Sequence, residues 1–294
     1  MQKLGVIVNT QKPRAAAVLQ QLAKVATETG ISLLLAHDCE SLASGLDVVP
    51  DDSFLLEADA VMALGGDGTM LAAVRRLAAT GKSLPPLMGL NIGSLGFMTS
   101  LTESDMQAAL RCMREDDFSV SERSLIACNV TREEVSVFGH HQGLNDVVVR
   151  NGATSRVVML EVSIDDSLVT TYVCDGVIVS TPTGSTGYSL SADGPIVLPQ
   201  TSVFVVSVIC PHTLSSRPLV VPDRAVIQIK VCGHAAGLRV SIDGQDEHGL
   251  GVGDVVTLCR SDQCVRLLHL PTYDYFAVLR QKLGWSGSAV TPLQ

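Results

Sequence analysis

The first part of the chain alternates short apolar runs with segments whose apolar residues recur at helical spacing. Val18, Leu22 and Val25 fall on one stripe of a helix that Gly30 would end. The pattern predicts strands at residues 4–9, 31–37, 58–64 and 86–90, and helices at residues 14–29, 70–77 and 102–113. Strands that alternate with helices are typical of a parallel, doubly wound sheet. Ligands of such sheets bind beyond the carboxyl ends of the strands, so a site is expected in the loops there.

From about residue 118 the helical spacing disappears, and runs rich in Val, Ile and Thr follow one another between turn-forming pairs such as Asn151-Gly152. Strands are predicted at residues 125–130, 135–138, 147–150, 157–164, 177–180, 203–209, 225–231, 238–242 and 255–258. This change predicts two domains. A Rossmann-like α/β domain with a parallel sheet would comprise residues 1–117, and a β-rich, mainly antiparallel domain residues 118–270. The closing segment, residues 271–294 with a predicted helix, is expected to pack back onto the first domain.

Composition and charge narrow the function classes. Hydrophobic residues make up 46 % of the 294 residues but aromatic ones only 4 %, so the cores must consist mainly of Val, Leu, Ile and Ala. The formal charge of −9, from 21 Lys and Arg against 30 Asp and Glu, repels phosphate backbones and argues against nucleic acid as a partner. The longest strongly apolar run, residues 203–210, falls short of the roughly 20 residues that span a bilayer. No membrane association is expected.

The pattern of the eight cysteines, together with the amino-terminal residues, indicates a reducing compartment. None of them forms a C-x-x-C pair or stands beside histidine at zinc-ligand spacing. The amino-terminal residues become polar too early for a secretory signal. We expect free thiols in a cytoplasmic protein.

Three glycines and an aspartate lie where the third predicted strand gives way to a helix, in the segment Gly65-Gly66-Asp67-Gly68-Thr69. Glycine lets the backbone approach a phosphate closely, and N–H groups at the start of a helix attract anions. The carboxylate of Asp67 would repel phosphate, which favours a role in handling a proton or a metal ion. Since neither a P-loop nor the G-x-G-x-x-G fingerprint fits, this loop is the predicted phosphate binder.

Several segments together resemble the NAD kinase family. The Gly-Gly-Asp-Gly-Thr loop is also similar to one in diacylglycerol and sphingosine kinases and, more loosely, in phosphofructokinases, whereas the other segments single out the NAD kinases. These segments are residues 89–97 (GLNIGSLGF), 144–148 (LNDVV), 175–191 (DGVIVSTPTGSTGYSLS), 211–218 (PHTLSSRP), 242–245 (IDGQ) and 279–285 (LRQKLGW). They occur in the family's order over nearly the whole chain, so the resemblance is to a bacterial-type ATP-NAD kinase.

The resemblance implies transfer of the terminal phosphoryl group of ATP to the adenosine 2′-hydroxyl of NAD, which gives NADP. It also implies Mg²⁺ or another divalent ion, although no direct metal ligands are identifiable in the sequence. Phosphoryl transfer needs positioning, charge neutralisation and a base near the attacking hydroxyl. Asp67 fits that base, the role that the family gives to this aspartate, and the alternative is that it only holds Mg²⁺ or water. Gly65, Gly66, Gly68 and Thr69 would bind the donor phosphates.

The NAD site is expected mainly in the second half of the chain. An amide beside a carboxylate can hold the two hydroxyls of a ribose, and the resemblance gives this role to Asn145 and Asp146, with an ordinary Asn-Asp turn as the alternative. The hydroxyl-rich segment 181–188 offers partners to an adenine edge, with Tyr188 as a stacking surface. The NAD contacts implied by the resemblance are Asp67, Gly68, Asn145, Asp146, Arg156, Asp175, Thr186, Gly187, Tyr188, Ser191 and Gln245. For Arg156 a solvated surface position is the alternative.

Three positions depart from the commonest family form. Asp146 replaces Glu and is one methylene shorter, so the ribose must come about 1 Å closer or a water must bridge. Val173 stands where many bacterial members carry Arg, and Gly187 replaces Ala. These departures leave the reaction class unchanged, but they bear on the choice between NAD and NADH and on sensitivity to NADP.

Two other functions share parts of this pattern. A lipid kinase of the diacylglycerol type would contain the glycine loop, but the charge of −9 and the lack of a basic amphipathic helix speak against it. A non-catalytic NADP sensor on the same fold would not need a proton acceptor at Asp67. The resemblance also implies a homodimer or homotetramer formed through the β-rich domain.

Overall fold

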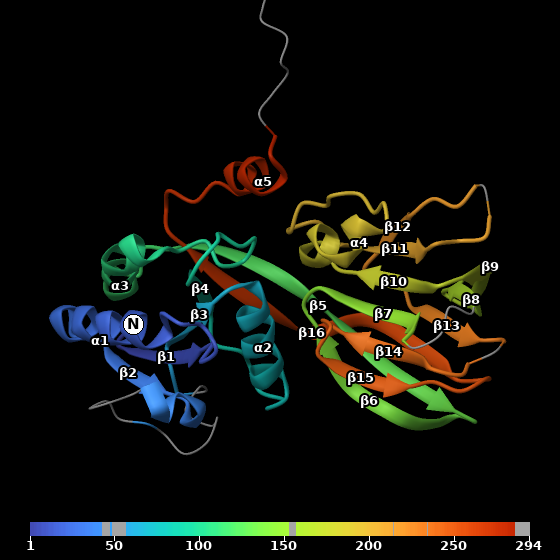
Figure 1. Cartoon of the computed structure of the whole chain (residues 1–294), viewed down its shortest axis with the longest axis horizontal. Helices are drawn as coiled ribbons and strands as arrows, with labels where there is room; N and C mark the ends of the chain where they lie inside the picture. The colour runs from blue at the N-terminus through green and yellow to red at the C-terminus, as the bar shows by residue number, and fades with distance from the viewer. Residues whose placement is uncertain (43–47, 49–56, 153–156, 214, 234, 286–294) are drawn as a thin grey trace, which may run out of the picture. The chain divides into compact units, whose positions relative to one another are not determined.

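The chain divides into two compact units, labelled by element in Figure 1. The computed structural model describes residues 1–42, 48, 57–152, 157–213, 215–233 and 235–285. Unit 1 comprises Met1–Ser121 and Arg266–Gln294, and unit 2 comprises Glu122–Val265. No helix among the described residues is long and apolar enough to cross a bilayer.

Unit 1 contains a parallel sheet with the strand order β2-β1-β3-β4. Its strands are β1 (Lys3–Val8), β2 (Ser32–Leu35), β3 (Ala60–Gly65) and β4 (Leu87–Asn91). The chain passes from β1 to β2 on one side and returns to β3 on the other side of β1. The carboxyl ends of β1 and β3 therefore form a switch point, the place where ligand sites occur in open α/β sheets. The loop that follows β3 begins there.

The helices of unit 1 are α1 (Ala15–Thr29), α2 (Asp67–Ala78), α3 (Met106–Glu115) and α5 (Tyr275–Leu283), with short 3₁₀ turns η1 (His37–Leu42) and η3 (Glu103–Asp105). α1 packs against α3, whereas α2 packs against β3 and β1. Gly30 ends α1 in the left-handed conformation with φ 69°, as the sequence predicts. Thr102 caps the turn before α3 by donating its N–H to the carboxylate of Asp105 at 2.9 Å.

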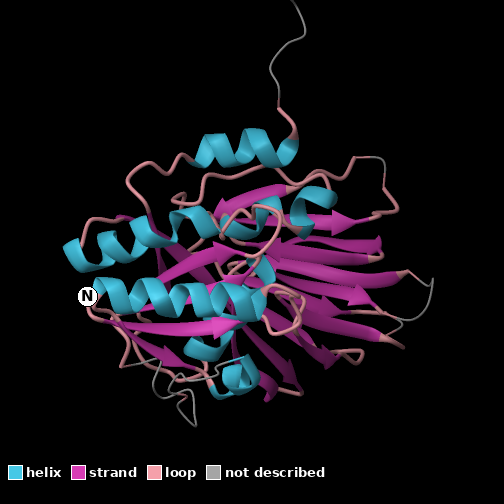
Figure 2. Cartoon of the chain, turned by 60° about the vertical axis from the view of Figure 1, so that its left-hand side comes forward, coloured by secondary structure: helices cyan, strands magenta, loops and turns pink. Residues whose placement is uncertain are grey.

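Unit 2 consists almost entirely of strands, and its described residues contain only the short helical turns η4 (Thr183–Thr186) and α4 (Tyr188–Ser191), as Figure 2 shows in colour. One antiparallel sheet has the order β12-β11-β10-β7-β14-β15. These strands are β7 (Asp146–Asn151), β10 (Gly176–Ser180), β11 (Val203–Ile209), β12 (Leu219–Pro222), β14 (Leu238–Ile242) and β15 (Asp246–Gly249). The remaining strands are β5 (Ser119–Arg132), β6 (Val135–Gly143), β8 (Val158–Ile164), β9 (Ser167–Cys174), β13 (Ile227–Val231) and β16 (Val255–His269).

The core of unit 2 lies on one face of the antiparallel sheet. Val147 and Val149 of β7 and Val177 and Val179 of β10 are buried there with Phe204. Because successive side chains of a strand point to opposite faces, the intervening residues of these strands lie on the other face. That second face carries the polar residues of the candidate site.

The predicted fold class is confirmed: a parallel α/β unit combines with a β-rich, mainly antiparallel unit. The sequence pattern missed strands β9, β12 and β15, which lie at the edges of their sheets and whose residues are mostly exposed or half-buried. An edge strand of this kind lacks the alternation of buried and exposed residues on which the prediction depends.

Candidate functional site

The glycine loop of unit 1 joins β3 directly to α2. β3 ends at Gly65, Gly66 is extended, and α2 begins at Asp67. A side chain at Gly65 would overlap Thr69, whose hydroxyl accepts the N–H of Gly66 at 3.3 Å. Gly66 and Gly68 have open space where a Cβ would lie, with no described atom within 4 Å. This loop therefore offers bare backbone at a helix start, which is the geometry that favours a bound phosphate.

The carboxylate of Asp67 is held by a second loop, residues 93–99. Its Oδ2 accepts the N–H of Phe97 at 2.8 Å. Its Oδ1 accepts three donors: the N–H of Met98 at 3.0 Å, the N–H of Thr99 at 3.1 Å and the hydroxyl of Thr99 at 3.2 Å. A carboxylate has about four acceptor positions, two on each oxygen. Oδ1 is thus saturated, whereas Oδ2 keeps an acceptor position with which it can take a proton.

A hydrogen-bond chain runs behind Asp67. The side-chain amide of Asn91, at the end of β4, donates to the Thr99 hydroxyl at 3.0 Å, and that hydroxyl donates to Asp67. Asn91 and Thr99 are both buried. Gly96 completes the arrangement, because a Cβ there would overlap the Asp67 carboxylate and the Thr99 hydroxyl. The sequence analysis included Asn91 and Gly96 in the family-like segment 89–97 but gave them no role, and it missed Thr99. The glycines of that segment were the signal for a close approach.

The carboxyl-terminal helix covers part of the same loop. The ammonium group of Lys282 on α5 lies 5.5 Å from the centre of the Phe97 ring, which is within cation–π distance. Asp274 caps α5 by accepting the N–H of Phe276 at 2.8 Å, and Gly284 ends it at φ 66°. The motif at residues 279–285 thus belongs to a helix that packs near the Asp67 loop.

In unit 2 a buried aspartate fixes the Asn145-Asp146 pair. The carboxylate of Asp243 accepts the N–H groups of Leu144 at 2.8 Å, Asn145 at 2.7 Å and Asp146 at 3.1 Å. Asp243 itself has φ 50° in the turn with Gly244. In the sequence this residue registers only as a turn signal, so its contact across 97–99 positions of the chain was not foreseen.

The hydroxyl-rich segment clamps the same pair from the other side. The Thr181 N–H donates to the carbonyl of Asn145 at 2.8 Å, and the Thr181 hydroxyl donates to the carbonyl of Leu144 at 2.5 Å. Gly184 lies directly on the Asn145 backbone, where no Cβ would fit. The side-chain oxygen of Asn145 is buried and accepts no hydrogen bond from the described residues. A buried acceptor without a donor is costly, so it favours a ligand that brings one.

Burial dominates the electrostatics of the pair. Asp146 is only 6 % exposed, and this burial raises the pKa of its carboxyl to about 7, with the Asp243 carboxylate acting in the same direction. Burial also raises the pKa of Asp243, while its three N–H donors oppose that rise. Asp146 can therefore change its charge near neutral pH.

A cavity of about 210 Å³ opens in front of this pair, within unit 2. It is lined by Asn145, Asp146, Val148, Arg150, Tyr188, Ser241, Asp243 and Gly244. Gly187 stands at its edge, since a Cβ there would lie 3.8 Å from both the Asn145 amide nitrogen and Asp146 Oδ2. The structure thus brings four of the predicted residues together: Asn145, Asp146, Gly187 and Tyr188.

Other predicted residues are not among those that line this cavity. Ser191 is exposed at the end of α4, Gln245 donates its N–H to Ile242 at 2.9 Å, and Thr186 donates its hydroxyl to Thr183 at 3.3 Å. Asp175 lies at the opposite end of β10, because Gly176 pairs with Arg150 whereas Ser180 pairs with Asp146. Arg156 lies outside the described residues.

Two family models cover most of the chain. The model described as the ATP-NAD kinase N-terminal domain matches residues 4–118, and the one described as the ATP-NAD kinase C-terminal domain matches residues 144–270. The chain belongs to the NAD kinase family. The NAD kinase of Geotalea daltonii is 38 % identical over 285 residues, which are 97 % of this chain and 99 % of that protein. The NAD kinase of Moorella thermoacetica is 37 % identical over 290 residues, 98 % of this chain and 91 % of that protein.

Solved structures of the NAD kinase family share the fold. Yeast NADH kinase complexed with NADH superimposes with a TM-score of 0.87 at 23 % identity, covering all of this chain and 90 % of that one. An NAD kinase from Archaeoglobus fulgidus in complex with ATP has a TM-score of 0.77 at 23 % identity, covering 97 % of this chain and 100 % of that one. The predicted family is therefore confirmed by sequence, and the fold by structure.

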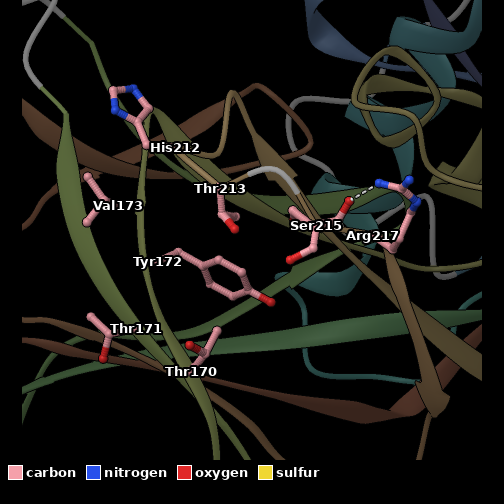
Figure 3. Close-up of a pocket in the computed structure, with 9 residues that line it drawn as sticks. Thr170, Thr171, Tyr172, Val173, His212, Thr213, Ser215 and Arg217 are labelled. Atoms are coloured by element: carbon pink, nitrogen blue, oxygen red, sulfur yellow. Dashed lines mark hydrogen bonds between the residues drawn. The ribbon is translucent and has the colours of Figure 1, made fainter.

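A second cavity of this NAD kinase family member, larger than the one at Asn145 and Asp146, is lined in part by Val173. Val173 is one of the departures from the family pattern. The cavity measures about 470 Å³ and lies between β9 and the loop after β11 (Figure 3). Thr170, Thr171, Tyr172, Val173, His212, Thr213, Ser215, Ser216 and Arg217 line it. No carboxylate is among these described lining residues.

Proposed function

We propose that this protein phosphorylates the adenosine 2′-hydroxyl of NAD with ATP as the donor. The observation that carries the proposal is the Asp67 carboxylate, fixed by four hydrogen bonds at the start of α2 with one acceptor position left on Oδ2. The N-terminal family model, residues 4–118, includes the loop that carries Asp67, and the relatives named NAD kinase match nearly the whole chain.

The proposed reaction uses Asp67 as the base. As the 2′-oxygen forms its bond to the γ-phosphorus of ATP, the bond from that phosphorus to the β-phosphate oxygen breaks and ADP leaves. The proton of the 2′-hydroxyl passes to Oδ2 of Asp67. The backbone of Gly65, Gly66 and Gly68, with Thr69, binds the donor phosphates at the positive end of α2.

Magnesium fits this site as an ion carried by the substrate. Mg²⁺ usually keeps several waters and takes one or two carboxylates together with substrate phosphates. Among the described residues no three His, Cys, Asp or Glu side chains gather into a metal site. Because the open position on Asp67 Oδ2 takes the proton in this proposal, the ion would be held by the substrate phosphates and by waters. Bound with ATP, the ion would neutralise charge on the phosphates.

The proposed acceptor site is the cavity of about 210 Å³ in unit 2. The buried side-chain oxygen of Asn145 accepts a ribose hydroxyl, and the Asp146 carboxylate accepts the neighbouring one. Tyr188, 39 % exposed, offers its ring to the adenine. Gly68, Arg156, Asp175, Thr186, Gly187, Ser191 and Gln245 stay predicted NAD contacts.

Formation of NADP from ATP, Mg²⁺ and NAD tests the function. Purified protein should give NADP that an NADP-specific dehydrogenase detects, and parallel reactions with NADH should show which acceptor the Asp146 and Val173 departures favour. If the protein binds NAD tightly but makes no NADP with ATP or other phosphoryl donors, the sensor function replaces the kinase.

The raised pKa of Asp146 predicts that NAD binding weakens in acid. The ionised carboxylate accepts ribose hydroxyls, and with a pKa of about 7 it is mostly protonated at pH 6. The dissociation constant of NAD should therefore rise about tenfold from pH 8 to pH 6. Titration calorimetry measures it, and Asp146→Asn, which cannot titrate, should show no such change. A wild-type dissociation constant independent of pH would contradict the assignment.

The same shift affects stability with the opposite sign. Because the folded pKa of about 7 lies above the usual 3.8, the folded protein binds more protons than the unfolded chain between these values. Asp146 therefore favours folding more at pH 5 than at pH 8.

We also propose that the protein is a cytoplasmic homo-oligomer. All eight cysteines are free, as a reducing compartment requires. β9 is the last strand of its sheet and exposes Leu168 at 64 %, Val169 at 39 % and Val173 at 37 %. An apolar edge strand invites pairing with a second copy. Light scattering on the purified protein should give the mass of a dimer or tetramer, and a monomer mass would overturn this.

A further inference from the structure

A row of four residues crosses the outer face of the antiparallel sheet in unit 2. Gly176 of β10 pairs with Arg150 of β7, Arg150 pairs with Arg239 of β14, and Arg239 pairs with Gly249 of β15. Residues directly opposite each other in a sheet place their side chains on the same face. Two arginines thus stand side by side between two glycines.

This arrangement is unfavourable for the protein alone. Like charges directly opposite on neighbouring strands destabilise a sheet. Among the residues that the structure describes, one carboxylate offsets the two arginines. Arg239 forms an ion pair with Glu247 at 3.2 Å, with side chains 54 % and 40 % exposed. Within the described part of the chain, Arg150 has no carboxylate within ion-pair distance. Two guanidinium groups against one carboxylate leave one positive charge at this place, which attracts anions locally in a protein with a net charge of −9.

The arginines line a cavity, and the glycines around them keep it open. The cavity measures about 370 Å³ and is lined by Arg150, Gly152, Arg239, Ser241 and Glu247. A Cβ on Gly176 would overlap the carbonyl oxygen of Val149 and lie 2.9 Å from the Cβ of Arg150, so the glycine lets β10 lie against β7 at Arg150. The Cδ of Arg239 lies 3.6 Å from where a Cβ of Gly152 would be.

This cavity continues the one in front of Asn145 and Asp146. Both are lined by Arg150 and Ser241. Along β7 the outer-face residues are Asp146, Val148 and Arg150, which places Arg150 about 13 Å from Asp146 at roughly 3.3 Å per residue. A long side chain at Arg150 can reach back over part of that span.

We propose that Arg150 and Arg239 form a binding site for the phosphate groups of a small ligand. Each guanidinium can donate two parallel hydrogen bonds to phosphate oxygens, and two of them facing one cavity suit a diphosphate. Two sources supply this chemistry: the diphosphate of a dinucleotide whose ribose lies at Asn145 and Asp146, or a separate phosphate-bearing metabolite. The first source rests on the proposed function, whereas the phosphate site itself does not.

Titration calorimetry with inorganic pyrophosphate in chloride buffer tests the site. Arg150→Gln and Arg239→Gln should each weaken pyrophosphate binding at least about tenfold, the lower end for a lost charge-assisted hydrogen bond, and the double variant should abolish it. Lys230→Gln is the matched control, because Lys230 is an exposed cation on β13 of the same unit and its loss changes the net charge equally. It should leave binding unchanged.

A variant with the opposite effect makes the test sharper. Glu247 competes with the ligand for Arg239, so Glu247→Gln should tighten pyrophosphate binding two- to threefold or more. This factor corresponds to the free energy of an exposed ion pair. Melting temperatures of the arginine variants should equal or exceed that of the wild type, because these side chains are exposed and each substitution relieves the repulsion between the two guanidinium groups. If wild-type protein does not bind pyrophosphate, or the double variant binds it as well as Lys230→Gln does, the proposal is overturned.

Binding of NAD and adenosine distinguishes the two sources. If the double variant weakens NAD binding but not adenosine binding, the site holds the diphosphate of the dinucleotide. If it loses only pyrophosphate binding, the site serves a separate metabolite. Both outcomes support the phosphate site, and neither depends on NADP formation, so failure of the kinase function remains distinguishable.

Discussion

Replacing Asp67 with Asn should lower kcat for NADP formation about 10²- to 10⁴-fold, the usual contribution of a positioned base. The amide cannot take the proton of the 2′-hydroxyl, whereas the glycine backbone that we propose for the donor phosphates is unchanged. The KM for ATP should therefore change only a few-fold. Initial rates at saturating ATP and NAD, with the melting temperature of the variant, measure this.

The contacts of Asp67 define the control for that experiment. In Asp67→Asn one oxygen becomes an NH₂ group, which cannot accept the N–H of Phe97 or those of Met98 and Thr99. Part of any loss could thus come from a displaced loop. Thr99→Val removes the hydroxyl donor but keeps the three backbone donors and the carboxylate. It should lower kcat about tenfold or less.

Two outcomes would contradict the role of Asp67 as the base. If Asp67→Asn retained more than a tenth of the wild-type kcat, Asp67 would serve to hold the second loop or Mg²⁺ rather than to take a proton. If the kcat of Thr99→Val fell as far as the kcat of Asp67→Asn, the position of the carboxylate would matter more than its basicity.

Replacing Gly184 with Ala should damage the acceptor site most among the glycines of unit 2. Its Cβ would overlap the backbone of Asn145, and backbone held by Asp243 and Thr181 cannot move aside cheaply. We expect the free energy of unfolding to fall by about 1–3 kcal/mol, the usual cost of overpacking, and the KM for NAD to rise at least tenfold. Urea unfolding and initial rates measure both effects.

The neighbouring glycine provides a matched control. In Gly187→Ala the new Cβ would lie 3.2 Å from the carbonyl oxygen of Gly184 and 3.8 Å from the side chains of Asn145 and Asp146. A shift of a few tenths of an ångström accommodates it, so stability and KM should stay close to the wild type. A Gly184→Ala variant that behaves like Gly187→Ala would show that the contact with Asn145 does not hold the site in place.

Much of the fold could be predicted from signals between residues that are close in the sequence. Gly30 ends α1, and the loop at Gly65 joins a strand to a helix, both as predicted. Each depends on residues a few positions apart, so a short stretch of chain contains the full physical cause. β9 was not predicted, because its residues do not alternate between buried and exposed positions. The place of β9 at the sheet edge, which no local pattern shows, is the cause.

The sequence predicted the functional side chains of the candidate site but not the residues that hold them in position. Asp67, Asn145 and Asp146 could be picked from motifs, because a carboxylate among glycines and an amide beside a carboxylate have few other uses. Asp243 could not, since its contacts with residues 144–146 span 97–99 positions of the chain. Asp175 shows the converse, because it begins the longest motif and yet lies at the far end of β10 from Asp146.

The sequence by itself determined the family, the alternation that builds each unit and the chemical groups available to the site. Tertiary structure alone decided which acceptor of Asp67 stays open, that burial moves the pKa of Asp146 to about 7, and that Arg150 stands opposite Arg239. The physical reason is that hydrogen-bond saturation, desolvation and strand register depend on atoms brought together from distant parts of the chain, which no local pattern of residues encodes.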